Sequence, residues 1–275
     1  MILVNGVRQD CVPAADRGLN YGDGVFETIA VRDGRCLLWE EHLARLYDSL
    51  ARLRFAAVPD RNLLRDEASM LAAEIGHGVL KIVVTRGSGR RGYRVTGDES
   101  PNRVIRAQPW DASITAARAT GVSVRTCTLR LMREPAALAA IKHLNRLPLV
   151  LARMEWNAEY EEGLLLDEQD RLVEGTMSNV FLVRQGVLVT PALDCCGIAG
   201  TMRAQVLRRA PTLALPVETR TVAAQETSGA DEIFLTNSII GIWPVRALDG
   251  RNLNIGPVTR ALQSALNEQN PPLFA

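Results

Sequence analysis

Tight-turn dipeptides alternate with helical stretches along the whole chain, and this pattern constrains the fold most. Asn5-Gly6, Asp33-Gly34 and Asp249-Gly250 each separate short runs with strand character. Such dipeptides favour two-residue β-hairpin turns. A doubly wound parallel sheet needs helical crossovers instead of hairpins. The sequence therefore predicts an α+β fold made of two α/β subdomains.

Apolar spacing and turn residues set the expected elements and domain limits. Residues 109–121 mix Pro, Asp, Ser and Ala and end at Gly121, which is typical of a linker. We therefore expect a small N-terminal α+β domain over residues 1–108, an interdomain linker over 109–121 and a larger C-terminal domain over 122–275. Helices are expected over residues 40–54, 61–75 and 136–156, and from 200 and 257. Strands are expected over 79–85, 103–108, 122–130 and 232–236, and pairs of strands over 164–173 and 180–189.

Charge and cysteine content narrow the class of partner. The 275 residues carry 32 basic and 31 acidic side chains, a formal net charge of +1, so nothing favours nucleic acid or an anionic membrane. The five cysteines are odd in number and form no CxxC, which favours neither a disulfide framework nor a metal site. No signal peptide or membrane-spanning run is apparent. We expect a soluble, cytoplasmic protein that acts on a small molecule.

Only two of the 32 basic residues are lysines, Lys81 and Lys142. A genome that favours arginine codons explains most of this bias, yet a lysine also persists where a primary amine is required. Small and apolar residues flank Lys142, so we expect it in a partly buried pocket, where burial favours the neutral, nucleophilic amine. The alternative is an ordinary solvated helix lysine. Lys81 is interpreted as the polar member of an apolar strand.

Several weaker signals suggest a site for a phosphorylated ring compound. Glu174 ends an expected strand, where its carboxylate could keep a ring nitrogen protonated, although glutamate before glycine is also common in turns. Glycines before the helix expected at 200 would let backbone amides meet an anion, or form an ordinary helix entry. Hydroxyls after the 232–236 strand and Arg45 could add phosphate contacts. Neither GxxxxGK[ST] nor GxGxxG is present.

Taken together, these segments resemble the class IV pyridoxal-phosphate family of branched-chain aminotransferases, D-amino-acid aminotransferases and 4-amino-4-deoxychorismate lyases. The resemblance covers residues 4–245 and rests on the order and spacing of the motifs. The motifs are Tyr21-Gly22-Asp23-Gly24-Val25-Phe26-Glu27-Thr28, His42-x-x-Arg45-Leu46, Lys142-x-x-Asn145, Glu174-Gly175-x-x-Ser178-Asn179 and Gly200-x-x-Arg203.

The resemblance implies a fold type IV enzyme with pyridoxal 5'-phosphate in the cleft between the two subdomains, the C-terminal one binding the cofactor. It implies a homodimer and no metal. Lys142 would carry the cofactor as a Schiff base and then transfer protons, and Glu174 would pair with the pyridine nitrogen. The expected phosphate ligands are Arg45, the amides of Thr201 and Met202, and the Ser238 hydroxyl; Asn179 completes the cofactor-binding set.

Within the family, residues 141–147 and 78–93 resemble aminodeoxychorismate lyases. Branched-chain aminotransferases carry a tyrosine five residues after the lysine, where this chain has Leu147. The implied reaction is elimination of pyruvate from 4-amino-4-deoxychorismate to give 4-aminobenzoate, a step towards folate; a D-amino-acid or branched-chain aminotransferase is the alternative. Thr28 is expected to assist Lys142. Arg91, Tyr93 and Phe26 are the candidate substrate-binding residues.

Overall fold

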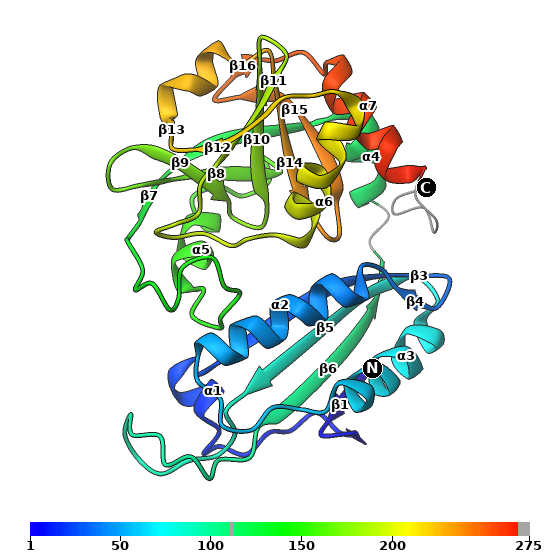
Figure 1. The fold of residues 1–275 in the computed structure, drawn as a ribbon, viewed down its shortest axis with the longest axis vertical. Coiled ribbons are helices and arrows are strands. Elements are labelled where there is room, and N and C mark those ends of the chain that lie inside the picture. The colour runs from blue at the N-terminus through cyan, green and yellow to red at the C-terminus, as the bar shows by residue number, and fades with distance from the viewer. Residues whose placement is uncertain (111–112, 269–275) are drawn as a thin grey trace. The chain divides into compact units, whose positions relative to one another are not determined.

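The computed structural model describes residues 1–110 and 113–268, and the chain divides into two compact units (Figure 1). The first unit contains Met1–Asp111 and Ile141–Asn145. The second contains Ala112–Ala140 and Arg146–Ala275. The chain therefore leaves the second unit for five residues, which include Lys142, and then returns to it.

The first unit is an antiparallel six-stranded sheet, in the order β2-β1-β6-β5-β3-β4. Asn5-Gly6 and Asp33-Gly34 have positive φ, as a type I′ hairpin turn requires, which confirms both turns. The strands are β1 (Ile2–Val4), β2 (Val7–Arg8), β3 (Gly24–Arg32), β4 (Arg35–Cys36), β5 (Gly78–Thr85) and β6 (Asn102–Pro109); the helices are α1 (Arg17–Tyr21), α2 (Trp39–Arg52) and α3 (Arg61–Ile75).

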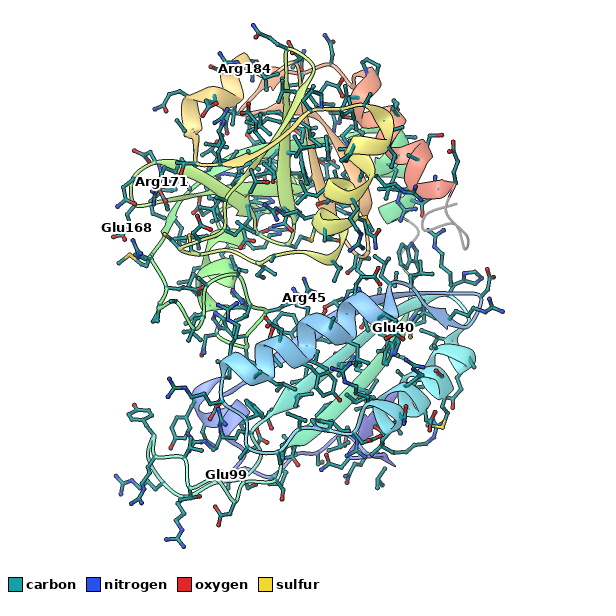
Figure 2. All side chains as sticks on the ribbon, viewed as in Figure 1. Glu40, Arg45, Glu99, Glu168, Arg171 and Arg184 are labelled. Atoms are coloured by element: carbon teal, nitrogen blue, oxygen red, sulfur yellow. The ribbon has the colours of Figure 1, made fainter. Side chains whose placement is uncertain are left out.

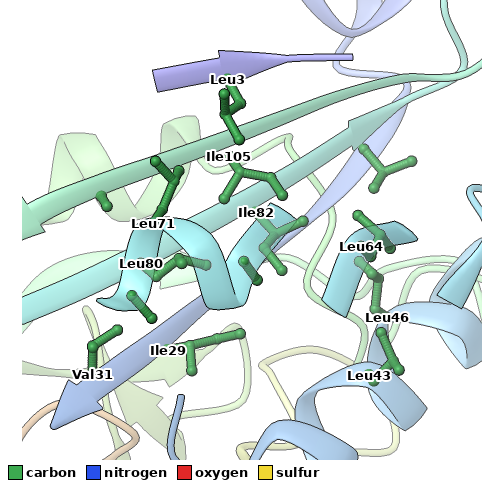
Figure 3. Packing of buried hydrophobic residues seen from close by; sticks show 14 of the residues in the cluster. Leu3, Ile29, Val31, Leu43, Leu46, Leu64, Leu71, Leu80, Ile82 and Ile105 are labelled. Carbon is green, nitrogen blue, oxygen red and sulfur yellow. The ribbon is translucent and has the colours of Figure 1, made fainter. Parts of the chain in front are cut away.

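Helices α2 and α3 pack on one face of this sheet through an apolar core (Figure 3). Alternate residues of β3 and β5 point into it, among them Ile29, Leu80 and Ile82, each at most 1% exposed. Leu46 and Leu64 enter from the two helices. Because buried leucine and isoleucine side chains stabilise by about 1.5–3 kcal/mol each, the core-facing side of the sheet is rigid.

The second unit holds a ten-stranded mixed sheet in which β7 runs parallel to both β15 and β8. None of the described helices is long and apolar enough to cross a bilayer. The strands are β7 (Val122–Leu131), β8 (Glu162–Asp167), β9 (Arg171–Gly175), β10 (Asn179–Arg184), β11 (Val187–Pro191), β12 (Val217–Arg220), β13 (Val222–Ala223), β14 (Glu232–Asn237), β15 (Gly241–Leu248) and β16 (Arg251–Asn252); the helices are α4 (Ser113–Thr120), α5 (Leu147–Arg153), α6 (Thr201–Arg209), η1 (Ala210–Leu213), η2 (Ala224–Gly229) and α7 (Pro257–Asn267).

Two expectations about the middle of the chain need correction. The helix expected over residues 136–156 is wrong for most of its length, because only α5 is helical and Pro148 lies in its first turn, the position a proline tolerates. Residues 141–145 pair with β3 instead. The stretch expected as a linker, 109–121, contains α4, while residues 111 and 112 lie outside the described part of the chain.

Candidate functional site

Lys142 lies on an extended stretch that pairs with the start of β3. The Phe26 amide donates to the Lys142 carbonyl at 3.0 Å, and the Leu144 amide donates to the Gly24 carbonyl at 3.0 Å. Val25 and His143 face each other in this antiparallel bridge. Side chains alternate across a pleated pair, so Lys142 points to the same side as Phe26. The interpretation of Lys142 as a helix lysine is therefore wrong.

Both lysines of the chain approach the ring of Phe26. The Nζ atom of Lys142 is 4.4 Å from the ring centroid and that of Lys81 is 4.7 Å from it. Thr28 lies opposite Lys81 in the β3–β5 register. These four side chains share the sheet face opposite α2 and α3. Lys81 is indeed the exposed polar residue of its strand, but the sequence alone did not place both lysines at the ring of Phe26.

Arg45 lies on α2 (Figure 2) and is held by a buried carboxylate on β3. Its Nε donates to Glu27 Oε1 at 2.8 Å and its Nη2 to Glu27 Oε2 at 2.5 Å. His42 Nδ1 lies 2.7 Å from the same Oε2. The Glu27 and His42 side chains are each 1% exposed and that of Arg45 is 14% exposed. This buried cluster fixes the direction of the Arg45 guanidinium.

The charges in this cluster set the protonation of its members. Burial alone would raise the pKa of Glu27, but the charge and hydrogen bonds of Arg45, helped by His42, hold it at about 2. Burial lowers the pKa of His42 against the opposing effect of Glu27. From the sequence alone, Glu27 and His42 were noted only as members of the family motifs. The three-residue spacing of His42 and Arg45 on one helix face was a signal that both meet a common partner.

Arg91 and Tyr93, the expected substrate ligands, lie on the loop after β5. Arg91 is exposed, and Tyr93 is 85% exposed with its ring 5.4 Å from that of Tyr21. The loop is held by α1: Arg17 donates to the carbonyls of Gly92 and Tyr93. The structure thus places Arg91 and Tyr93 in the same unit as Lys142 and Phe26.

In the second unit, a turn before α6 collects the expected cofactor-binding residues. The Glu174 carboxylate is 3% exposed and accepts from the Ile198 amide at 2.8 Å. Asn179 donates to the Ile198 carbonyl at 2.8 Å and accepts from the Gly200 amide at 3.1 Å. Glu174 and Asn179 therefore both contact the turn of residues 198–200.

Helix α6 begins directly after this turn. Gly200 is its N-cap, in an extended conformation. A Cβ atom at Gly200 would lie 2.1 Å from Asn179 Oδ1, so glycine is required for this approach. Thr201 and Met202 follow in the first turn. Ser238 follows β14, in which Thr236 pairs with Asn179, so the expected phosphate residues of this unit gather at one end of the sheet.

A second buried carboxylate shapes the turn between Glu174 and Asn179. Glu162, 1% exposed, accepts from the amides of Gly163, Thr176 and Met177 and from the hydroxyls of Thr176 and Ser178. Burial raises the pKa of Glu162 despite these donors, which are all neutral. Sequence reasoning missed Glu162, because a glutamate in a strand carries no local sign of such a role.

The groups in the two units match the chemistry of pyridoxal phosphate. Lys142 provides an amine for its aldehyde, and Glu174 provides a buried carboxylate for its ring nitrogen. The start of α6, at Gly200, Thr201 and Met202, is the kind of helix N-terminus whose backbone N–H groups would suit a phosphate. The donor set therefore fits the cofactor.

Comparisons with known proteins agree with this geometry. The model of the amino-transferase class IV family matches residues 24–248. An aminodeoxychorismate lyase of Vibrio harveyi is 34% identical over 97% of this chain and 100% of its own length. The crystal structure of 4-amino-4-deoxychorismate lyase from Pseudomonas aeruginosa superposes with a TM-score of 0.92, at 45% identity, covering 98% of this chain and 99% of that one.

A third relative was solved with the expected cofactor bound. The PLP-bound form of a hypothetical aminotransferase from Mycobacterium tuberculosis has a TM-score of 0.80 and 25% identity, covering 94% of this chain and 92% of that one. The α+β, fold type IV architecture expected from the sequence is confirmed by the structural matches. The chain belongs to the class IV aminotransferase family.

Proposed function

We propose that this protein is an aminodeoxychorismate lyase, a pyridoxal-phosphate enzyme that converts 4-amino-4-deoxychorismate to 4-aminobenzoate and pyruvate, a step towards folate. The main observation behind this proposal is that the Lys142 and Lys81 amines both lie near the Phe26 ring, on one face of the sheet of the first unit. The substrate bears two carboxylates and a carbocycle, and this face offers positive charge beside an aromatic ring. The two lyases described above support the same reaction.

In the proposed reaction, Lys142, assisted by Thr28, transfers the protons. Bound pyridoxal phosphate supplies an electron sink for the charge left on carbon. Lys142 would hold the cofactor through its amine until the substrate amine takes that place, and it would take the cofactor back when 4-aminobenzoate is released. In between, its free amine takes the proton from the amine-bearing carbon. As an ammonium, Lys142 then donates to the departing enolpyruvyl oxygen, a general-acid contribution of about 10²–10⁴-fold, with Thr28 assisting. The C–O bond breaks, pyruvate leaves as its enol, and the ring becomes aromatic.

The remaining assignments hold the cofactor and the substrate. Glu174 keeps the ring nitrogen protonated, and Asn179 fixes the turn in front of α6. Arg91, Tyr93 and Phe26 receive the substrate, with Arg91 on a carboxylate. The phosphate ligands in this proposal are Arg45, the amides of Thr201 and Met202, and Ser238.

The aminotransferase alternative requires a second substrate, a keto acid, whereas the lyase requires none. Branched-chain aminotransferases carry a tyrosine at the position of Leu147, which is 66% exposed here. A chain that lacks this aromatic residue favours the lyase over that alternative.

Turnover without an acceptor tests the proposal. The yellow holoenzyme is given 4-amino-4-deoxychorismate with no keto acid, and 4-aminobenzoate and pyruvate are both followed. We expect equal amounts of the two products, and none from Lys142→Ala. If 4-aminobenzoate does not form while a D-amino or branched-chain donor plus keto acid reacts, the lyase proposal is wrong and the aminotransferase replaces it.

A homodimer in the cytoplasm is part of this proposal. Four apolar side chains on and beside α5 are exposed: Leu147 66%, Val150 52%, Leu151 49% and Met154 74%. Apolar side chains so close together are typical of a covered surface. Analytical ultracentrifugation at micromolar concentration should give twice the chain mass, and a Val150→Glu, Met154→Glu variant should shift towards monomer. A monomeric wild type would contradict the dimer.

A further inference from the structure

The loop after β5 keeps its conformation without a core of its own. None of residues 88–98 is buried, and Tyr93 is 85% exposed. Buried apolar contacts are what normally order such a segment. Its shape must therefore depend on hydrogen bonds: residues 96 and 97 bond to Asp98 and Glu99, whereas Gly92 and Tyr93 bond to α1.

Arg17, on α1, is the centre of these hydrogen bonds and is only 3% exposed. Its Nη1 donates to the Gly92 carbonyl at 3.1 Å and its Nη2 to the Tyr93 carbonyl at 3.3 Å, while its Nε donates to Asp23 Oδ2 at 2.9 Å. Each guanidinium nitrogen thus meets a different acceptor. A lysine has one nitrogen on a flexible stem and cannot reproduce this planar fork.

Tyr21, the last residue of α1, adds two more contacts to the same part of the loop. Its hydroxyl accepts from the Gly92 amide at 3.1 Å, and its ring meets that of Tyr93 edge to face. The carbonyl of Gly87, at the start of the loop, accepts from the Arg17 amide at 2.8 Å. Both the start and the tip of the loop are therefore tied to α1.

The turn after α1 also holds the Lys142 stretch. The Gly22 carbonyl accepts from the Asn145 side chain at 3.4 Å, and the Gly24 carbonyl accepts from the Leu144 amide at 3.0 Å. On its other side Gly24 pairs with Thr85, the last residue of β5 before the loop. Two strand spacings of about 4.8 Å each separate the start of the loop from the Lys142 stretch, and α1 with its turn contacts both.

We propose that Arg17, supported by Tyr21, is a positioning residue for substrate binding. It fixes the loop of residues 87–93, and with it Arg91, relative to the stretch that carries Lys142. The inference rests on the proposed function, in which Arg91 binds a substrate carboxylate. Loss of the hydrogen bonds from Arg17 and Tyr21 to the loop should weaken substrate binding and leave the chemistry at Lys142 intact.

Two measurements on Tyr21→Phe and Arg17→Lys test the proposal. Trypsin cuts after Arg90, Arg91 and Arg94 when the loop opens, which mass spectrometry follows. Tyr21→Phe removes one hydrogen-bond acceptor, so we expect about three- to tenfold faster cleavage there and a similar rise in KM for 4-amino-4-deoxychorismate. Arg17→Lys should raise both by more than about tenfold. For both variants, kcat should stay within about twofold and cofactor absorbance should not change.

Tyr47→Phe is the matched control, because it removes a tyrosine hydroxyl that donates to the Pro59 carbonyl in the same unit. Unchanged cleavage in Tyr21→Phe would overturn the proposal, and so would faster cleavage with an unchanged KM. An equal change in the control would show a general loss of stability and overturn it too. If the wild type does not turn over the substrate, the proposed function fails, while the cleavage rates still decide whether α1 holds the loop.

Discussion

Two carboxylates, one in each unit, are buried to the same 1% exposure, yet their pKa values shift in opposite directions. Glu27 meets the guanidinium of Arg45 and the imidazole of His42, and its pKa falls to about 2. Glu162 meets only neutral N–H and O–H groups, and burial raises its pKa. In this protein, neutral donors do not offset the cost of burying a carboxylate, whereas a paired cation does.

This difference in pKa decides which kind of group each carboxylate can orient. Glu27 stays ionised over the whole physiological range, so it can fix the direction of the Arg45 guanidinium. Glu162 instead organises a turn of neutral backbone, the one between Glu174 and Asn179. The first unit thus holds a cluster of charged side chains, and the second holds a carboxylate beside an ordered turn of backbone.

Replacing Glu27 should have the largest effect on stability. Glu27→Gln leaves Arg45 and His42 without their buried partner, and breaking such a pair costs about 3–5 kcal/mol in unfolding free energy. The dissociation constant for pyridoxal phosphate should also rise by about tenfold, since Arg45 loses its fixed direction. Urea unfolding and a cofactor titration measure the two effects.

Glu67→Gln provides the matched control for that variant. Glu67 pairs with Arg103 in the same unit, with side chains 8% and 16% exposed, away from the residues proposed for the cofactor. It should lower stability and leave cofactor affinity unchanged. If Glu27→Gln and Glu67→Gln lowered the affinity for pyridoxal phosphate equally, Glu27 would have no specific role in cofactor binding.

Acid should destabilise the wild type through the same cluster. The pKa of Glu27 is lower in the folded state than its ordinary value, so its contribution is present above pH 4.5 and is lost as pH falls towards 2. The contribution is about 3 kcal/mol, from 1.36 kcal/mol per pKa unit. The lowered pKa of His42 acts in the same direction below pH 6.5. The stability difference between wild type and Glu27→Gln should therefore shrink over this range; a constant difference would contradict the pairing.

Glu162→Gln should have a smaller effect with the opposite pH dependence. The pKa of Glu162 is raised by folding, so its contribution is greatest below pH 4.5 and declines as pH rises through the raised pKa. The amide keeps one acceptor oxygen, and we expect a loss of about 1–3 kcal/mol for the bonds it cannot make. Unfolding curves at pH 4 and pH 7 measure this. If Glu162→Gln lowered the free energy of unfolding at pH 7 as much as Glu27→Gln does, the contrast between the two carboxylates would be wrong.

The elements with a local signal were predictable from the sequence. The turns at Asn5-Gly6 and Asp33-Gly34 have the backbone that these residues favour, and the helix over Arg61–Ile75 has the expected limits. The helix that contains Arg203 begins next to the expected Gly200. In each case neighbouring residues decide the conformation.

The rest depends on partners far along the chain. Residues 141–145 look helical by composition, but pairing with Gly24 and Phe26, more than 100 residues earlier, makes them extended. The approach of Lys142 to the Phe26 ring, which Lys81 also approaches, follows from the same pairing. The contact of Arg17 with Gly92 joins residues 75 apart. No local pattern encodes such contacts, because tertiary pairing overrides propensity.

The identity of the cofactor-bearing lysine is the central claim, and the two lysines of this chain make it directly testable. The holoenzyme is reduced with borohydride, digested and mapped by mass spectrometry. We expect the phosphopyridoxyl mass on the peptide that contains Lys142 and none on the peptide that contains Lys81. A label on Lys81, or no label on either lysine of a protein that binds pyridoxal phosphate, would contradict the account.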